Sequence, residues 1–200
     1  NLGIAINENF HLSYPFIFKD GKNLYMCPET NQKKDIRIYK CTNFPLKWKL
    51  EKILIKNISA VDTNIFYYDR KWWILTNLCS GNLNKFENEL HLFFNKNLIS
   101  SNWKSHKNNP IIFDPTKARN GGFIKDNGEF YRIFQKQGFN SYGESIGVTK
   151  INKLSKDEYG ESLKFNVFPD YFKDITGTHT LNYSKGLLAI DFKRNEFYKI

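Results

Sequence analysis

Apolar and polar residues alternate along this chain in short runs, and turn residues separate the runs. This pattern is typical of β-strands. The runs come in units with a spacing of roughly 50–60 residues, each opening with a strand, a tight turn and a second strand. The expected strand pairs are Pro15–Phe18 with Asn23–Met26, Asn64–Tyr67 with Trp72–Leu75, Gly122–Ile124 with Phe130–Phe134, and His179–Tyr183 with Leu187–Ile190.

The turns within these pairs support the strand interpretation. Asp20-Gly21 and Asn127-Gly128 contain residues that tolerate a positive φ, which two-residue hairpin turns require. Ser184-Lys185-Gly186 fills the same place in the last unit, and Tyr68–Lys71 in the second. Each unit therefore predicts a β-hairpin.

Further strands follow most of the hairpins. The expected third strands are Arg37–Lys40, Glu89–Phe94 and Ser145–Ile151, and Trp48–Leu54 is an expected fourth strand. Four-stranded units at this spacing are typical of β-propeller blades. The sequence thus predicts an all-β fold, a propeller with about four blades in one domain over residues 1–200. The expected blades cover approximately residues 11–56, 60–108, 118–170 and 176–200.

Two segments do not fit the repeat. Leu154–Tyr159 is expected to form a short helical turn capped by Ser155, and Leu2–Ile6 is expected to be an isolated strand. The last unit also has no clear third or fourth strand before Ile200. We interpret the chain as a five-bladed ring that lacks most of one blade, and a closed ring of four blades is the alternative.

Composition changes this picture little. Aromatic residues make up 16% of the chain, which favours strands. The formal net charge of +10 raises the question of a nucleic-acid partner. Lysines are nevertheless spread along the chain without a basic stripe, and no zinc-finger or RNA-binding signature occurs. No nucleic-acid partner is therefore expected.

Cysteines and apolar runs bear on compartment and cofactors. Cys27, Cys41 and Cys79 have no metal-binding spacing, and an odd number of cysteines without a pattern fits a reducing compartment. No run approaches the ~18 apolar residues of a membrane span, and no signal peptide is visible. We expect a cytoplasmic protein with no cofactor, no metal and no membrane span.

A set of short segments, taken together and in this order, points to a known family. They are His11–Phe16, Pro28–Thr30, Phe44–Trp48, Val61–Thr63, Lys71–Trp73, Asn109-Pro110, Ala118–Gly122, Tyr131–Gln135, Tyr142-Gly143 and Gly177–Thr180. Together they resemble the N-terminal domain of glucosamine inositolphosphorylceramide transferases, whose bacterial versions accompany formyltransferases. That domain is similar to the five-bladed propellers of arabinanases, levansucrases and invertases.

The resemblance implies a ligand and a partner domain, and the chain differs from the family pattern at one point. It implies a saccharide or sugar-nucleotide ligand, and a transferase domain on the parent chain. The family usually has an earlier blade that opens with an Ala-Asp-Pro-Phe-like strand, and this chain has no such motif. In the related hydrolases a catalytic base lies on that blade.

Candidate catalytic residues follow from the propeller architecture, because residues that open the innermost strands converge on one central mouth. Glycoside hydrolysis needs two carboxyl groups beside the scissile bond. The resemblance places Asp62 at the position that tunes the acid. Where the acid is expected the chain has Arg119–Gly122, so Glu29 or Glu144 would have to substitute for it. Alternatively, the Asp62 carboxylate caps backbone amides.

Candidate ligand-binding residues lie at the same ends of the strands. They are Tyr14, Arg119, Asn120, Arg132, Gln135 and His179. A guanidinium binds phosphate or carboxylate through two hydrogen bonds, so Arg119 and Arg132 suggest an anionic or phosphorylated sugar. The alternative for both arginines is an ion pair between blades, for example with Asp62 or Glu144. His179 could donate to a sugar hydroxyl or satisfy backbone groups.

The leading hypothesis is a carbohydrate-recognising propeller module of a surface-glycan or glycolipid biosynthetic glycosyl- or formyltransferase system. The second is a glycoside hydrolase-like enzyme with paired carboxylates in the mouth. A third is a scaffold propeller that binds protein.

Overall fold

Four units of antiparallel strands follow one another along the chain. The computed structural model describes residues 1–79, 86, 88–137 and 143–194. In the first unit each strand pairs with the next, in the order β1 (Ser13–Asp20), β2 (Asn23–Glu29), β3 (Asp35–Asn43), β4 (Lys47–Lys56). Only one helical turn occurs in these residues, the 3₁₀ turn η1 (Asn31–Lys33).

The second and third units repeat this arrangement. The second contains β5 (Ala60–Tyr68), β6 (Lys71–Leu78), β7 (Glu89–Asn95), β8 (Lys104–Ser105) and β9 (Ile112–Phe113), where both short strands pair with β7. The third contains β10 (Asn120–Asp126), β11 (Glu129–Lys136), β12 (Ser145–Leu154) and β13 (Tyr159–Val167). The predicted all-β propeller is therefore confirmed, and all four predicted hairpins form.

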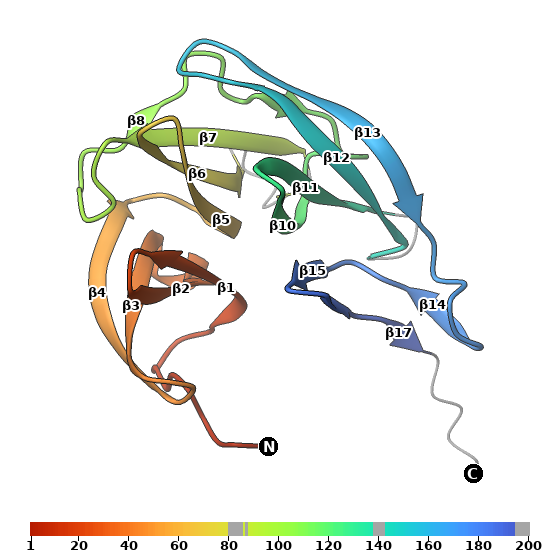
Figure 1. Cartoon of the computed structure of the whole chain (residues 1–200), viewed down its shortest axis with the longest axis horizontal. Helices are drawn as coiled ribbons and strands as arrows, with labels where there is room; N and C mark the ends of the chain where they lie inside the picture. Colours follow the sequence, from red (N-terminus) through yellow and green to blue (C-terminus); the bar gives the residue numbers. More distant parts are fainter. Residues whose placement is uncertain (80–85, 87, 138–142, 195–200) are drawn as a thin grey trace.

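The last unit is smaller than the others. Its hairpin is β15 (Leu181–Ser184) with β16 (Leu187–Ile190), and beside it β14 (Ile175–Gly177) pairs with β17 (Lys193–Arg194). The four units follow an arc with β1, β5, β10 and β15 innermost, and an opening separates β1 from the β15–β16 hairpin (Figure 1). A closed ring of four blades is therefore not adopted.

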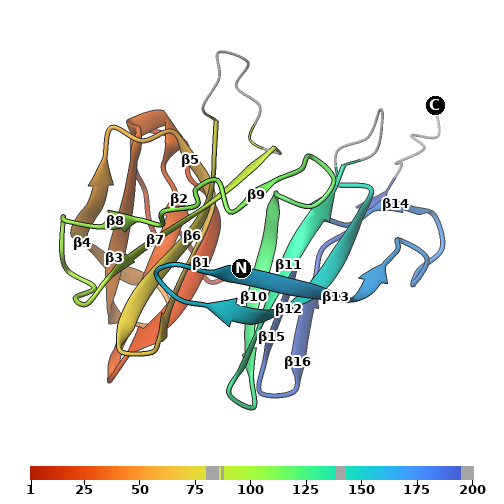
Figure 2. The same cartoon turned by 90° about the horizontal axis from the view of Figure 1, so that it is seen from above.

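The units stand side by side like blades (Figure 2). Apolar side chains fill the spaces between neighbouring units. Trp72 joins the cluster between the first two units, whereas Trp73 joins the cluster between the second and third. Adjacent strand residues face opposite sides, so the two tryptophans hold β6 against both of its neighbours. The rings of Phe66 and Phe123 stack with centroids 4.2 Å apart across the second of these spaces.

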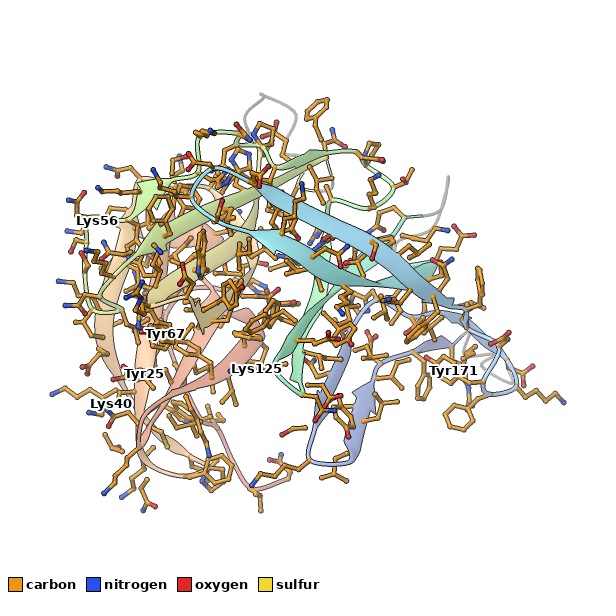
Figure 3. All side chains as sticks on the ribbon, turned by 45° about the horizontal axis from the view of Figure 1, so that its top comes forward. Tyr25, Lys40, Lys56, Tyr67, Lys125 and Tyr171 are labelled. Atoms are coloured by element: carbon orange, nitrogen blue, oxygen red, sulfur yellow. The ribbon has the colours of Figure 1, made fainter. Side chains whose placement is uncertain are left out.

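The charged side chains mostly lie outside these clusters. Lys56, on the edge strand β4, projects from the outer side of the arc (Figure 3). Lysine on an edge strand discourages pairing with another sheet. None of the helical structure within residues 1–79, 86, 88–137 and 143–194 is long and apolar enough to cross a membrane.

Two local predictions were wrong. Strand β12 continues to Leu154 and β13 begins at Tyr159, so no helical turn forms between them. The Ser155 hydroxyl instead accepts hydrogen bonds from the backbone N–H groups of Asp157 (3.1 Å) and Glu158 (2.9 Å) in a tight turn. The segment Leu2–Ile6 forms no strand.

Candidate functional site

The inner strands share an irregularity near their first residues. Their pairing with the second strand slips between Ser13 and Phe16 in β1, between Val61 and Asn64 in β5, and between Asn120 and Gly122 in β10. Within these bulges Tyr14 has a φ of 44° and Asp62 a φ of 51°. A β-bulge can redirect a side chain, and side-chain-bearing residues adopt such φ values only where the surroundings hold them. The repeated bulge therefore sets the directions of Tyr14 and Asp62.

Asp62 is the centre of contacts between the second and third units. Its side chain is buried and accepts a hydrogen bond from Arg119 Nε at 2.5 Å. Asn120 Nδ2 donates to the Asp62 carbonyl at 2.9 Å, and Gln135 Nε2 lies 3.5 Å from Asp62 Oδ2. Burial raises the pKa of Asp62, and the opposing charges of Arg119 and His179 do not fully offset that rise. The sequence-predicted residues Asp62, Arg119, Asn120 and Gln135 thus form one connected group.

Glu29 lies at the end of β2, where it pairs with Ser13. Burial raises the pKa of its carboxyl group, and the negative charge of Asp62 raises it further. Arg119, His11 and a hydrogen bond from Ser13 act in the opposite direction but are outweighed. The two candidate catalytic carboxyls are therefore close enough to influence each other, and both hold their protons more tightly than usual.

Glu144, the alternative acid, is exposed.

We expect Glu29→Gln to stabilise the fold at neutral pH, because the folded state then no longer holds a poorly solvated carboxylate. A carboxyl with a raised folded pKa costs stability above that pKa. The gain should therefore shrink as pH falls and vanish below the unfolded value near 4.5. Thermal midpoints at several pH values check this, with Glu144→Gln as the matched control. A gain that is constant with pH would contradict it.

The last unit contributes His179 to the mouth. His179 Nδ1 pairs with Asp191 Oδ2, and Asp191 Oδ1 accepts the backbone N–H groups of His179 (3.0 Å) and Thr180 (2.7 Å). Burial acts to raise the pKa of Asp191, but these hydrogen bonds lower it to about 2. His179 also lies close enough to the second unit for a protonated imidazole to lower the pKa of Asp62.

Glycines allow the third and last units to approach each other at this point. A Cβ on Gly121 would lie 2.5 Å from the His179 carbonyl oxygen, and one on Gly143 would lie 2.9 Å from His179 Cβ. Tyr142, beside Gly143, carried part of the family resemblance and lies outside the described residues. The backbone position of His179 therefore depends on the absence of side chains opposite it.

Arg132 is not available to a ligand in this structure. Its side chain is fully buried within the third unit, where Nε and Nη2 donate to the Glu161 carboxylate at 2.8 and 2.6 Å. Nη2 also donates to the Lys117 carbonyl at 2.8 Å. Of the alternatives for this residue, the geometry favours an ion pair, although it forms within one unit rather than between two.

Sequence reasoning did not find Asn64 and Asn77. Asn77 Nδ2 donates to the Ala118 carbonyl and its Oδ1 accepts the Asn120 N–H, at 2.9 and 2.8 Å. Asn64 Nδ2 donates to the Tyr14 hydroxyl at 3.2 Å, and burial raises the pKa of that hydroxyl far above its usual range. The repeat could have identified Asn77, because it pairs with the residue just before the bulge of its inner strand, as Glu29 does in the first unit.

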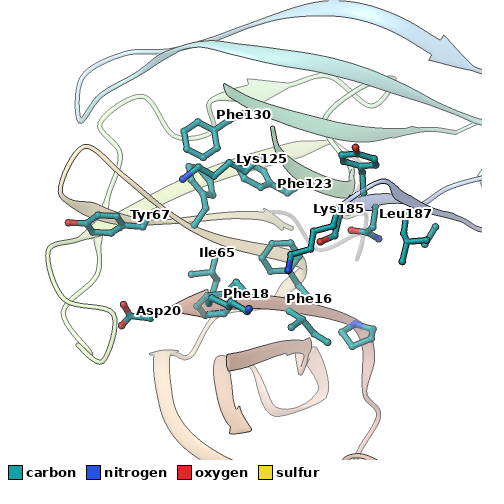
Figure 4. A pocket seen from close by; sticks show the side chains of 18 of the residues that line it. Phe16, Phe18, Asp20, Ile65, Tyr67, Phe123, Lys125, Phe130, Lys185 and Leu187 are labelled. Carbon is teal, nitrogen blue, oxygen red and sulfur yellow. The ribbon is translucent and has the colours of Figure 1, made fainter. Parts of the chain in front are cut away.

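Beyond these polar residues the inner strands line an apolar cavity of about 980 Å³ (Figure 4). Phe16, Ile65 and Phe123 line it, and Leu187 and Leu188 border it from the last unit. The inner strands are thus polar where they begin and contribute apolar side chains to this cavity farther along, where Asp20, Lys125 and Lys185 also line it. Among the described residues, no cluster of His, Cys, Asp and Glu could hold a metal ion.

The comparison with protein families identifies the chain's relatives. Residues 1–175 match the family model described as "Glucosamine inositolphosphorylceramide transferase 1, N-terminal". The chain belongs to this family. Relatives named glucosamine inositolphosphorylceramide transferase 1 in Oryza sativa subsp. japonica and Arabidopsis thaliana are each 40% identical over 164 residues, which is 80% of this chain. Those residues are 22% and 21% of the relatives' lengths, so this member of the transferase family spans about a fifth of each.

Solved structures show the same fold at low sequence identity. The exo-β-1,3-galactanase of Phanerochaete chrysosporium with galactose has a TM-score of 0.65 at 8% identity, covering 97% of this chain and 47% of that one. A native Bacillus subtilis arabinanase has a TM-score of 0.57 at 18% identity, covering 90% and 65%. These neighbours are five-bladed propellers. The cavity of this transferase-family chain is lined by residues of all four units.

Proposed function

We propose that this chain is a carbohydrate-binding propeller module of a larger glycolipid- or surface-glycan-synthesising protein. One observation carries the proposal. Three units bring Asp62, Arg119 and His179 to one mouth, where buried amides support them. Saccharide hydroxyl groups need closely spaced donors and acceptors on a rigid support, and strand ends braced by bulges and side-chain amides provide one.

The relatives support the biological setting of this proposal. Proteins named for glucosamine transfer to inositolphosphorylceramide contain a region 40% identical to this chain, and that region is about a fifth of their length. The remaining length leaves room for a separate transferase domain. In this arrangement the propeller holds a saccharide, and the chemistry takes place elsewhere on the parent protein.

A glycan array tests the proposed binding. We expect the wild-type chain to retain a subset of saccharides and Asp62→Asn to lose at least about tenfold in affinity, because a hydrogen bond to a charged group contributes about 1.5–3 kcal/mol. Glu158→Gln should bind as the wild type does, since Glu158 is exposed in the turn between β12 and β13. Circular dichroism confirms that both variants fold. Equal binding by wild type and Asp62→Asn would contradict the proposal.

A hydrolase-like activity is the second candidate, and the mutual influence of Glu29 and Asp62 favours it. Two carboxyls with raised pKa values resemble the acid of a glycosidase more than its base. Incubation with β-1,3-galactotriose and arabinan distinguishes the two candidates. Release of reducing ends that Glu29→Gln abolishes would favour hydrolysis, and saccharide binding without release would favour the module.

A further inference from the structure

Arg119 and His179, two candidate donors of the mouth, each have a carboxylate partner. Arg119 donates to Asp62, and His179 pairs with Asp191. A guanidinium binds phosphate tightly when its donors face the ligand. A phosphate at Arg119 would compete for the guanidinium charge with the Asp62 carboxylate, which is 5% exposed and depends on that charge. The arginine is therefore poorly suited to bind an anion.

The mouth also carries one more carboxyl group than these pairs use. Glu29 lies beside the Asp62–Arg119 pair, and the negative charge of Asp62 outweighs the positive charge of Arg119 in its effect on the Glu29 pKa. His11, which also acts on Glu29, is exposed. An ionised Glu29 beside the Asp62 carboxylate would repel a second anion at this end of the channel.

Hydrogen-bond acceptors are abundant at this end of the channel. Asn64 and Asn120 are fully buried, and among the described residues neither side-chain oxygen has a donor. Asn120 lies against the backbone of Asp62, and Asn64 against the Tyr14 hydroxyl. Buried acceptors are normally satisfied by protein groups or ordered water, and such a water can pass a hydrogen bond on to a ligand. Hydroxyl groups are donors that can satisfy both carboxylates and amide oxygens without adding charge.

We infer that the mouth selects uncharged saccharides and discriminates against phosphorylated sugars and sugar nucleotides. The inference rests on the proposed function and specifies its ligand class. The two arginines considered alone suggested an anionic or phosphorylated sugar, but Arg119 and Arg132 are each paired with a carboxylate. In the parent protein the propeller would then hold the neutral glycan part of a substrate, and a nucleotide-activated donor would bind elsewhere.

Saturation-transfer difference NMR on the intact chain tests the inference with matched probes. These are N-acetylglucosamine, N-acetylglucosamine 1-phosphate and UDP-N-acetylglucosamine, together with galactose and galactose 1-phosphate. We expect each neutral sugar to half-saturate at a concentration at least tenfold below its charged counterparts. Equal or tighter binding of the charged members would overturn the inference while leaving saccharide binding intact. If no probe and no array glycan binds, the proposed function itself fails.

Salt and charge variants separate an electrostatic cause from a merely structural one. Discrimination that arises from charge should shrink between 20 and 500 mM NaCl, since screening weakens partly exposed charges. Glu29→Gln should likewise reduce the ratio between neutral and phosphorylated sugars, whereas Glu129→Gln, at the opposite end of β11, should leave it unchanged. A ratio that responds to neither salt nor Glu29→Gln would overturn the inference.

Discussion

Arg132→Ala should be among the most destabilising single substitutions in this chain, lowering the free energy of unfolding by about 3–5 kcal/mol. The substitution leaves the Glu161 carboxylate buried without its charged partner. It also removes the donor to the Lys117 carbonyl, which anchors the loop before β10. Because domains are stable by only about 5–15 kcal/mol, much of the protein would be unfolded in mild urea.

Two variants and a pH series make this expectation specific. Arg132→Met combined with Glu161→Leu should recover most of the loss, because it removes both buried charges. Lys153→Ala removes an exposed ion pair with Glu158 and should leave the urea midpoint unchanged. Burial acts to raise the pKa of Glu161, but Arg132 and hydrogen bonds outweigh it and lower that pKa. The pair therefore stabilises the fold fully above the ordinary pKa of a carboxyl group. This stabilisation is lost as the pH falls through the lowered pKa of Glu161. An Arg132→Ala midpoint equal to that of Lys153→Ala would contradict this role.

Gly122→Ala should detach the last unit from the third. A Cβ at this position would lie 2.1 Å from the Leu181 carbonyl oxygen, and the residue has a φ of 152°. Backbone strain of about 1–3 kcal/mol and overpacking of about 1–3 kcal/mol together predict a loss of about 2–6 kcal/mol. The Leu181 carbonyl is backbone, so no side-chain rotation relieves the contact.

A second glycine separates the two contributions. Gly128 has a φ of 81° but no atom within 4 Å of the position its Cβ would occupy. Gly128→Ala should therefore cost only the strain of a left-handed residue, about 1–2 kcal/mol. Urea unfolding followed by tryptophan fluorescence and by hydrogen exchange of residues 175–194 measures both. Equal losses for the two variants, or unchanged exchange in the last unit, would show that the close approach is unimportant.

The hairpins could be predicted because their signals are local. Alternating apolar residues and turns such as Asp20-Gly21 and Asn127-Gly128 specify register over a few residues. The failed helix at Leu154–Tyr159 has the same origin, since a serine hydroxyl can cap a helix or close a tight turn. The β-strands on either side, which pair with each other, decided between the two.

The partners of the charged residues could not be predicted, because they depend on register between distant strands. Arg132 and Glu161 lie on β11 and β13, with β12 between them, and no local pattern links them. Arg119 pairs with Asp62 of the neighbouring unit. The sequence predicted this ion pair only as one of several alternatives. The bulges that direct Tyr14 and Asp62 were also missed, since no glycine marks either position.

The central claim is that side chains from separate units form one saccharide-binding mouth. Amide chemical shifts recorded during titration with the strongest neutral saccharide from the glycan array test it most directly. The account predicts shifts confined to the ends of the inner strands, at Tyr14, Asp62, Arg119 and His179 and their neighbours. Shifts centred instead on the outer strands β4, β8 and β13, with the mouth unchanged, would contradict it.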